Sequence, residues 1–181
     1  MEVLDVIRTR RSIRKYKTIS VDEKTIEQIL EAGRWAPSWA NTQCWRFIVV
    51  RDDNIKAELA STLTPGNPAA DCIENAPVTI VACAELERAG YSRGEPLTDK
   101  GDWFMFDVAL AMQNLVLAAH SLGLGTVYVG AFDAKKAASI LEVPSGFCVV
   151  AVTPLGYPDQ KGRAPSRKEL SEIVFHNKFG S

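Results

Sequence analysis

The sequence predicts one domain in which helices cover a small β-sheet, as an α/β or α+β sandwich. The chain has 181 residues, which fits a single domain and suffices to bury a real core. Its composition, 46% hydrophobic and 24% charged, is ordinary for a globular protein. Short apolar, β-branched runs alternate with helical segments, and no internal repeat or low-complexity tract interrupts them. This pattern alone leaves the strand order open.

The N-terminal part is expected to hold two helices joined by a basic segment. The apolar residues of segment 3–7 share one face of a short first helix. The second helix is predicted to begin at a capping box, Ser20-Val-Asp-Glu23, in which the two outer side chains satisfy free backbone amides. Residues 26–30 give this helix an apolar stripe, and it stops before Pro37, which cannot continue a helix.

The rest of the chain alternates strands, helices and loops. Four apolar runs predict strands, at residues 47–50, 78–83, 126–129 and 147–152. Three further helices are expected, at residues 53–63, 103–122 and 133–141, the last capped by Asp133. The 103–122 helix is apolar on most faces, so it should be central and buried, while its internal polar residues argue against a membrane span.

Glycine, proline and charged residues mark the loops. Residues 64–68 are predicted to form a loop because of their prolines and glycine, and residues 86–102 are expected to form a mobile surface loop. The tail from 154 to 181 has little helical period and is expected to be an extended arm, with one short element at 172–175.

Composition excludes several classes of function. The net charge of −1 is not that of a general nucleic-acid binder, which is usually strongly basic. The four cysteines form no CxxC pair, and only two histidines accompany them, so we expect no metal site and reduced, mostly buried thiols. The N-terminus carries charges and lacks the apolar stretch of a signal peptide, so a cytoplasmic protein is expected.

Common catalytic signatures are missing as well. No GxGxxG follows a predicted strand, and neither a GxxxxGK phosphate loop nor a GxSxG nucleophile elbow occurs. His120 lies in an apolar helix and is expected to be a hydrogen-bonded core residue. The protein groups therefore look poor in acid–base chemistry, which is typical of an enzyme whose cofactor carries the reaction.

Several segments could still bind a ligand. Arg8, Arg10, Arg11 and Arg14 cluster around Ser12, and arginine matches phosphate with a planar fork, although a solvated basic face would look the same.

The loop Ala36-Pro-Ser-Trp-Ala-Asn-Thr-Gln-Cys-Trp45 combines amide, hydroxyl and indole groups that could bond and stack a flat heterocycle, or simply pack two tryptophans. The glycines of segment 123–132 allow a close backbone approach to a ligand, or a helix C-cap. Lys161 and Arg163 flank Gly162 and could be plain surface charges.

Taken together and in this order, the segments resemble the nitroreductase family of FMN enzymes. Segment 10–16 is similar to the family's R-x-S-x-(K/R) element, and segment 36–45 to its A-P-S-x-x-N-x-Q-P-W element. Segment 123–132 resembles its G-L-G…G-(A/G)-F element, and Pro154-Leu-Gly-Tyr-Pro158 with Lys161-Gly-Arg163 its closing P-x-G-(Y/H)-P…K-x-R element. The likeness covers nearly the whole chain.

The resemblance implies an α+β fold, a mixed or antiparallel sheet flanked by helices, in an intertwined homodimer with two FMN sites. It implies phosphate contacts from Arg10, Lys161 and Arg163, with Arg11 and Ser12 near the phosphate or ribityl chain and Arg14 near the pyrimidine edge. The partner subunit would supply Pro37, Ser38 and Trp39, with Asn41 close by. The backbone of Gly130 and Ala131 would face flavin N5, and Asn67 would contact the flavin.

The implied function is an oxidoreductase in which NAD(P)H reduces FMN and the flavin then reduces a nitroaromatic, a quinone or a similar small acceptor by a ping-pong hydride mechanism. FMN carries the chemistry, so no catalytic side chain, metal, nucleic acid or membrane is expected. Alternatives are a specialised enzyme of the same fold, such as a dehalogenase, an ene-type reductase or a flavin-processing enzyme, and a non-catalytic flavin-binding module. A nucleic-acid binder using residues 8–17 is a more distant alternative.

Two features depart from the family pattern. Cys44 stands where the family usually has proline, and the chain is short for the family, so the substrate side of the site is expected to be open.

Overall fold

The computed structural model describes residues 2–180, and its centre is a four-stranded antiparallel sheet. The strand order is β1-β2-β6-β5, with β2 and β6 in the middle. The strands are β1 (Trp45–Val50), β2 (Val78–Glu85), β5 (Gly125–Thr126) and β6 (Phe147–Gly156). The predicted α+β class and antiparallel sheet are confirmed.

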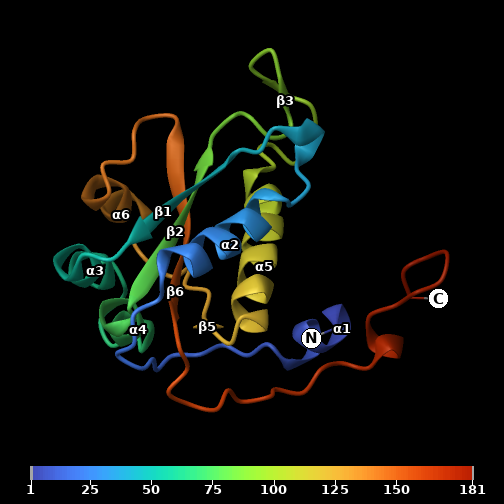
Figure 1. The fold of residues 1–181 in the computed structure, drawn as a ribbon. Helices are drawn as coiled ribbons and strands as arrows, with labels where there is room; N and C mark the ends of the chain where they lie inside the picture. The colour runs from blue at the N-terminus through green and yellow to red at the C-terminus, as the bar shows by residue number, and fades with distance from the viewer. Residues whose placement is uncertain (1, 181) are drawn as a thin grey trace.

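Helices cover both faces of this sheet (Figure 1). One face carries α3 (Asp53–Ala60), α4 (Ala69–Asn75) and α6 (Ala134–Ile140). The other carries α2 (Glu23–Arg34) and α5 (Phe104–Ser121). Side chains alternate between the faces along a strand, so in β2 Val81 packs toward the first group and Ile80 toward the second.

The second helix begins later than the sequence predicts. The prediction of a capping box at Ser20 is wrong. Asp22 is the N-cap, and its Oδ1 accepts a hydrogen bond from the backbone N–H of Thr25 at 2.9 Å. The apolar stripe is confirmed, since Ile26 and Ile29 are fully buried against α5 and the sheet. Asp133 caps α6 as predicted, accepting from the N–H of Lys136.

The central helix α5 runs as predicted, from Phe104 to Ser121. Within residues 2–180 it is a helix long and apolar enough to cross a membrane by length and composition. Here it packs against α2 and the sheet, which accounts for its apolar character.

Several predicted boundaries are wrong. The helix predicted for 53–63 stops at Ala60, and α4 was not predicted at all, because seven residues are too short for a helical period. The strand predicted for 126–129 pairs regularly only at Gly125–Thr126, whereas β6 continues past its predicted end at residue 152 to Gly156.

Residues 86–102 hold more structure than a plain loop. They contain a small hairpin, β3 (Tyr91–Ser92) and β4 (Glu95–Pro96), which turns at Gly94 with φ of +83°. Its base is held by the indole N–H of Trp103, which donates to the Thr98 hydroxyl at 2.9 Å.

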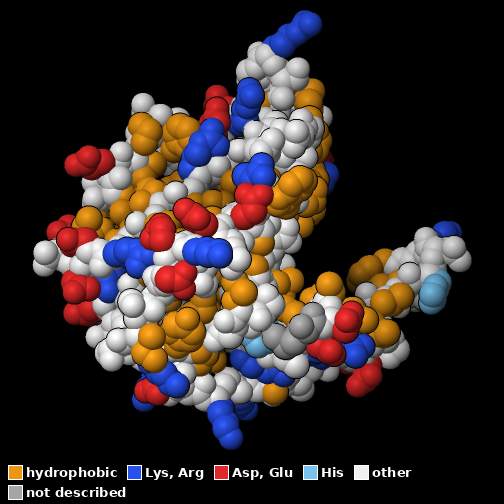
Figure 2. All heavy atoms as spheres, viewed as in Figure 1, with side chains coloured by type: hydrophobic (Ala, Val, Ile, Leu, Met, Phe, Trp, Pro, Cys, Tyr) orange, Lys and Arg blue, Asp and Glu red, His pale blue; other side chains and the backbone are white. Residues whose placement is uncertain are grey.

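In Figure 1 helix α1 (Val3–Thr9) lies next to the lower end of α5, and the last part of the arm lies to the side of it. Helix α1 is short, and its predicted apolar face is exposed rather than packed on the sheet. After β6 the chain extends as an arm that carries a single 3-10 turn, Leu170–Glu172, just before the predicted 172–175 element. Figures 1 and 2 show the arm standing away from the body with apolar side chains on it.

Candidate functional site

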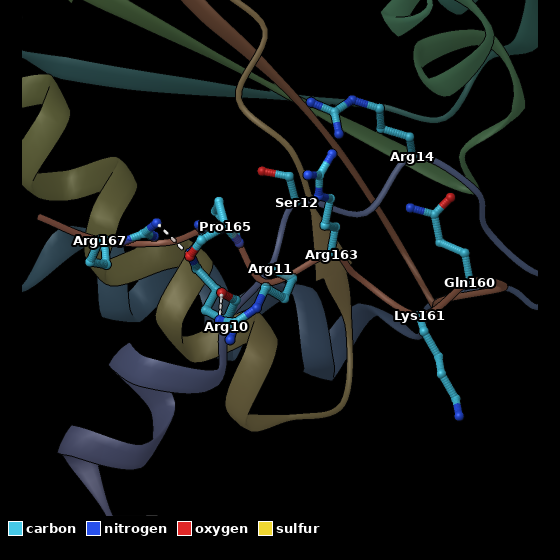
Figure 3. Close-up of a pocket in the computed structure, with 9 residues that line it drawn as sticks. All are labelled: Arg10, Arg11, Ser12, Arg14, Gln160, Lys161, Arg163, Pro165 and Arg167. Carbon is cyan, nitrogen blue, oxygen red and sulfur yellow. Dashed lines mark hydrogen bonds between the residues drawn. The ribbon is translucent and has the colours of Figure 1, made fainter.

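A basic cavity of about 680 Å³ lies between the N-terminal segment and the arm (Figure 3). Its lining residues are Arg10, Arg11, Ser12, Arg14, Gln160, Lys161, Arg163, Pro165 and Arg167. Five arginines and one lysine contribute to its lining, and none of the described lining residues is a carboxylate, so the cavity suits an anion with several oxygens.

The structure therefore brings together six predicted site residues from opposite ends of the chain. In Figure 3 Ser12, Arg14 and Arg163 point toward the same space, whereas Lys161 extends away from them. The sequence did not single out Gln160, Pro165 or Arg167. Arg167 could have been chosen from the sequence because it adds positive charge to the tail. No sequence feature would have pointed to Gln160 or Pro165 as site residues.

Segment 10–17 is held extended by backbone hydrogen bonds to β5 and to the chain that follows β6. The N–H of Ile13 donates to the carbonyl of Thr126 at 2.9 Å, and the N–H of Asp159 donates to the carbonyl of Lys15 at 2.9 Å. Ile13 is buried on one side, which leaves Ser12 and Arg14 to face the cavity.

Glycines permit this close docking. A Cβ on Gly125 would lie 2.7 Å from Cβ of Ile13, and a Cβ on Gly162 would collide with Cβ of Arg11. Side chains at these two positions would push the basic segment away from β5 and from the arm.

Arg10 holds a donor that nothing in the described chain uses. Its Nη1 is buried and has no hydrogen-bond partner within residues 2–180. Nη1 of Arg11, by contrast, donates to the carbonyls of Arg8 at 2.7 Å and Arg10 at 2.8 Å. A buried guanidinium nitrogen without an acceptor is costly, so its natural partner is a bound anion.

Two titratable groups lie near Arg10. Burial lowers the pKa of His120, and the charges of Arg10 and Arg11 lower it further, while its Nε2 lies 2.9 Å from Oγ1 of Thr9. Burial raises the pKa of Tyr128 to about 12, with Arg10 acting in the opposite direction. Both groups are therefore neutral near pH 7.

Tyr128 also borders a second cavity, of about 410 Å³, which is mostly apolar. Its lining residues are Met105, Val108, Ala109, Met112, Gln113, Tyr128, Val129, Gly130, Val150 and Ala151. Gly130 is thus at a cavity wall with open space where a Cβ would be, and Ala131 follows it on the exposed backbone. This cavity offers an apolar surface, and Tyr128 in its lining is close enough to Arg10 of the basic cavity for the charge of Arg10 to act on its pKa.

The loop 37–45 packs on the first turn of α5 and lines neither of these two cavities. Pro37, Ser38, Trp39 and Asn41 line no part of them. The backbone N–H of Trp39 instead donates to Asp107, a buried carboxylate in the first turn of α5 that no sequence motif singled out.

Asn67 is also separate from the basic cavity. Its Oδ1 accepts the backbone N–H of Ala69 at 3.0 Å, so it helps to start α4. The adjacent Pro68 and Arg14 share a third, polar cavity of about 420 Å³.

Comparison with known proteins gives a consistent result. The sequence model of the Nitroreductase family matches residues 7–71 and 65–157. A protein of Methanothermobacter thermautotrophicus described as an NADH dehydrogenase/NAD(P)H nitroreductase is 36% identical over 94% of this chain and 83% of its own. The FMN reductase (NAD(P)H) of Bacillus subtilis is 32% identical over 91% of this chain and 69% of its own.

Solved structures agree with these sequence relatives. A nitroreductase from Desulfovibrio desulfuricans, crystallised in complex with FMN, superposes with a TM-score of 0.80 and 34% identity, over 99% of this chain and 98% of that one.

Proposed function

The chain belongs to the nitroreductase family, and from that membership and its cavities we propose that it is an FMN-dependent oxidoreductase that NAD(P)H reduces and that passes electrons to a small acceptor. FMN is the cofactor and NAD(P)H the electron donor. The acceptor class that we propose is a nitroaromatic, a quinone or a similar flat, electron-poor molecule.

The observation that carries this proposal is a cavity whose described lining holds five arginines, one lysine and no carboxylate, and in which one lining residue, Arg10, keeps a buried Nη1 without a hydrogen-bond partner within residues 2–180. The phosphate of FMN is a dianion with three acceptor oxygens, and an arginine fork binds such a group through charge-assisted hydrogen bonds. Ser12, Arg11 and Arg163 line the same cavity and would share the phosphate, with Lys161 at its edge.

The ring system of the flavin would occupy the apolar cavity beside Gly130. Met112, Val150 and Ala151 are among the apolar residues that line it, and Tyr128 in the same lining is near Arg10. When bound, FMN supplies the hydride exchange itself. The chain's own residues hold the phosphate, orient the ring through the backbone at Gly130 and Ala131, and need no catalytic acid or base.

We further propose that two copies of the chain form each site, as an intertwined homodimer. Loop 37–41 and Asn67 line neither the basic nor the apolar cavity of their own chain, so the loop would serve the partner's flavin. Exposed apolar side chains support such pairing, since they gather on α1 and on the arm, among them Leu4 and Phe179.

The chain works, in this proposal, as one FMN-binding domain over residues 1–181, with residues 154–181 as its arm. We place it in the cytoplasm, because all four cysteines are free thiols and three of them are buried, as a reducing compartment allows.

The test is an absorption spectrum of the purified protein from about 300 to 550 nm, before and after anaerobic NADH or NADPH. Flavin bands that bleach with either donor are the expected result. Bound flavin that neither donor bleaches would favour the non-catalytic flavin-binding module. Failure to retain FMN even after incubation with it would overturn the proposal.

A further inference from the structure

Asp107 is a buried carboxylate that gathers one loop around itself. It is 1% exposed and lies in the first turn of α5. The backbone N–H of Trp39 donates to both of its oxygens, at 3.1 and 3.0 Å. Oδ2 also accepts from the Thr42 hydroxyl at 3.4 Å and from the Cys44 thiol at 3.8 Å. Three residues of loop 38–44 thus converge on one side chain.

The loop that Asp107 holds is conformationally strained. Ala40, Asn41 and Gln43 all have positive φ, at 43°, 55° and 48°. Side chains disfavour this left-handed region, and such strain persists only where the surroundings fix the backbone. Ser38 provides one internal restraint, since its Oγ accepts the N–H of Gln43 at 3.0 Å. Asp107 provides the link between the loop and the rigid central helix.

A carboxylate is a costly way to make this link. Asp107 has no ion-pair partner within residues 2–180, and its hydrogen-bond donors are neutral. Burial raises its pKa, an effect that the bonds from Trp39, Cys44 and Thr42 oppose. Only the N-terminal end of the α5 dipole adds a favourable field. The carboxylate offsets this cost because it places two acceptor oxygens on one rigid group. All three loop residues that it contacts are hydrogen-bond donors.

We propose that Asp107 is a positioning residue, which holds Trp39 and Asn41 in the conformation that completes the flavin pocket. The inference rests on the proposed function, since the loop acquires its role only where FMN binds. Asp107 touches no cofactor in this scheme and acts through the loop alone.

Asp107→Asn is the informative variant, because it keeps the size of the side chain and replaces one acceptor by a donor. Asp102→Asn is its matched control. Asp102 also lies at the start of α5 and accepts two backbone N–H groups, those of Phe104 at 3.0 Å and Glu87 at 2.6 Å, but it holds the hairpin side rather than loop 38–44.

Two readouts separate the possibilities, and one needs no flavin. In FMN-free protein we expect deuterium to label the hydrogen-bonded backbone amides of Trp39, Thr42 and Gln43 about tenfold faster in Asp107→Asn than in Asp102→Asn, because the loop opens more often. Amide exchange is chosen over alkylation of Cys44 because both aspartates raise the pKa of that thiol. At saturating FMN we expect the visible absorption and fluorescence of the bound flavin to change only in Asp107→Asn, with an FMN dissociation constant raised about tenfold.

Each outcome decides the matter. Unchanged exchange of the loop amides would overturn the proposal, and so would faster deuterium labelling with an unaltered flavin spectrum, which would make Asp107 a purely structural anchor. If Asp107→Asn does not fold, Thr42→Val removes one donor and should show the same two changes at about threefold size, and their absence would overturn the proposal. Wild-type protein that binds no FMN would overturn the proposed function and this inference, while the labelling result would still report whether Asp107 anchors the loop.

Discussion

Gly162 of the arm lies directly on the side chain of Arg11, so close that even a methyl group at position 162 would collide with Cβ of Arg11. No positive φ is required at Gly162, so the contact rather than the backbone conformation demands glycine. We expect Gly162→Ala to displace the arm, and with it Lys161 and Arg163, from the basic segment.

The expected result is a rise of about tenfold in the FMN dissociation constant, measured by fluorescence titration. The melting temperature should move by no more than about 2 °C, because the arm is exposed and adds little to the core. Ser166→Ala, in the same arm but outside the cavity lining, is the control. Equal affinities for both variants would show that the arm does not help to hold the cofactor.

Arg10→Ala removes the half-buried side chain whose buried Nη1 lacks a partner within the described chain. Hydrogen bonds to charged groups contribute about 1.5–3 kcal/mol, so the FMN dissociation constant should rise by about 10- to 150-fold. Arg8→Ala is the matched control, because Arg8 is an exposed neighbour with the same charge that does not line the cavity. An Arg10→Ala protein that purifies as yellow as Arg8→Ala would contradict the assignment of the phosphate site.

Much of the fold followed from local sequence signals. Periodicity located α2 and α5, and Asp133 was identified as a cap, because these features depend on neighbouring residues. The capping box at Ser20 was wrong because Asp22 competes for the same turn with a stronger acceptor. The length of β6 was underestimated because Pro154 suggested a break, although a strand tolerates proline where its missing N–H is not needed.

The site was predictable only in part, for a physical reason. The arginines are close in sequence and were visible as a cluster, and Lys161 and Arg163 gained meaning only through the family resemblance. Asp107 could not be chosen, since one aspartate in an apolar helix shows its role only when loop 38–44 folds back over it.

The four thiols should differ sharply in reactivity. Burial and the nearby Asp107 carboxylate raise the pKa of Cys44 to about 12, and burial raises that of Cys83 to about 11. Cys72 is also buried, whereas Cys148 is only partly so. At pH 8 we expect iodoacetamide to modify Cys148 first, and Cys44 at least about tenfold more slowly, because the reaction requires both a thiolate and access of the reagent to it.

Peptide mass spectrometry of timed samples measures the order of modification. The control is the chain unfolded in guanidinium, in which the four rates should converge. Modification of native Cys44 as fast as Cys148 would contradict this structure of the loop.

His120 should make stability depend on mildly acidic pH. Burial and the two neighbouring arginines lower its pKa in the folded chain, so the unfolded chain binds its proton more readily. The stabilisation is therefore complete above the ordinary histidine pKa of about 6.5 and is lost as the pH falls through the lower, folded value. We expect His120→Gln to flatten the dependence of melting temperature on pH below about 6.5 relative to the wild-type protein. A slope equal to that of the wild type would mean that another group titrates.

The apolar face of α1 should matter for assembly rather than for folding of one chain. Leu4 is 61% exposed, so in an isolated subunit Leu4→Asp would cost little stability. If this face packs on a second copy, the same change buries a charge at the interface, which costs several kcal/mol and should weaken the dimer at least about a hundredfold.

Sedimentation equilibrium across a dilution series measures this dissociation. Ile19→Asp, at an apolar residue 51% exposed and distant in sequence from α1, controls for added charge. If the wild-type protein is a monomer at every concentration, the proposal that two copies share each site is contradicted. If Leu4→Asp dimerises as tightly as Ile19→Asp, the interface does not include the apolar face of α1.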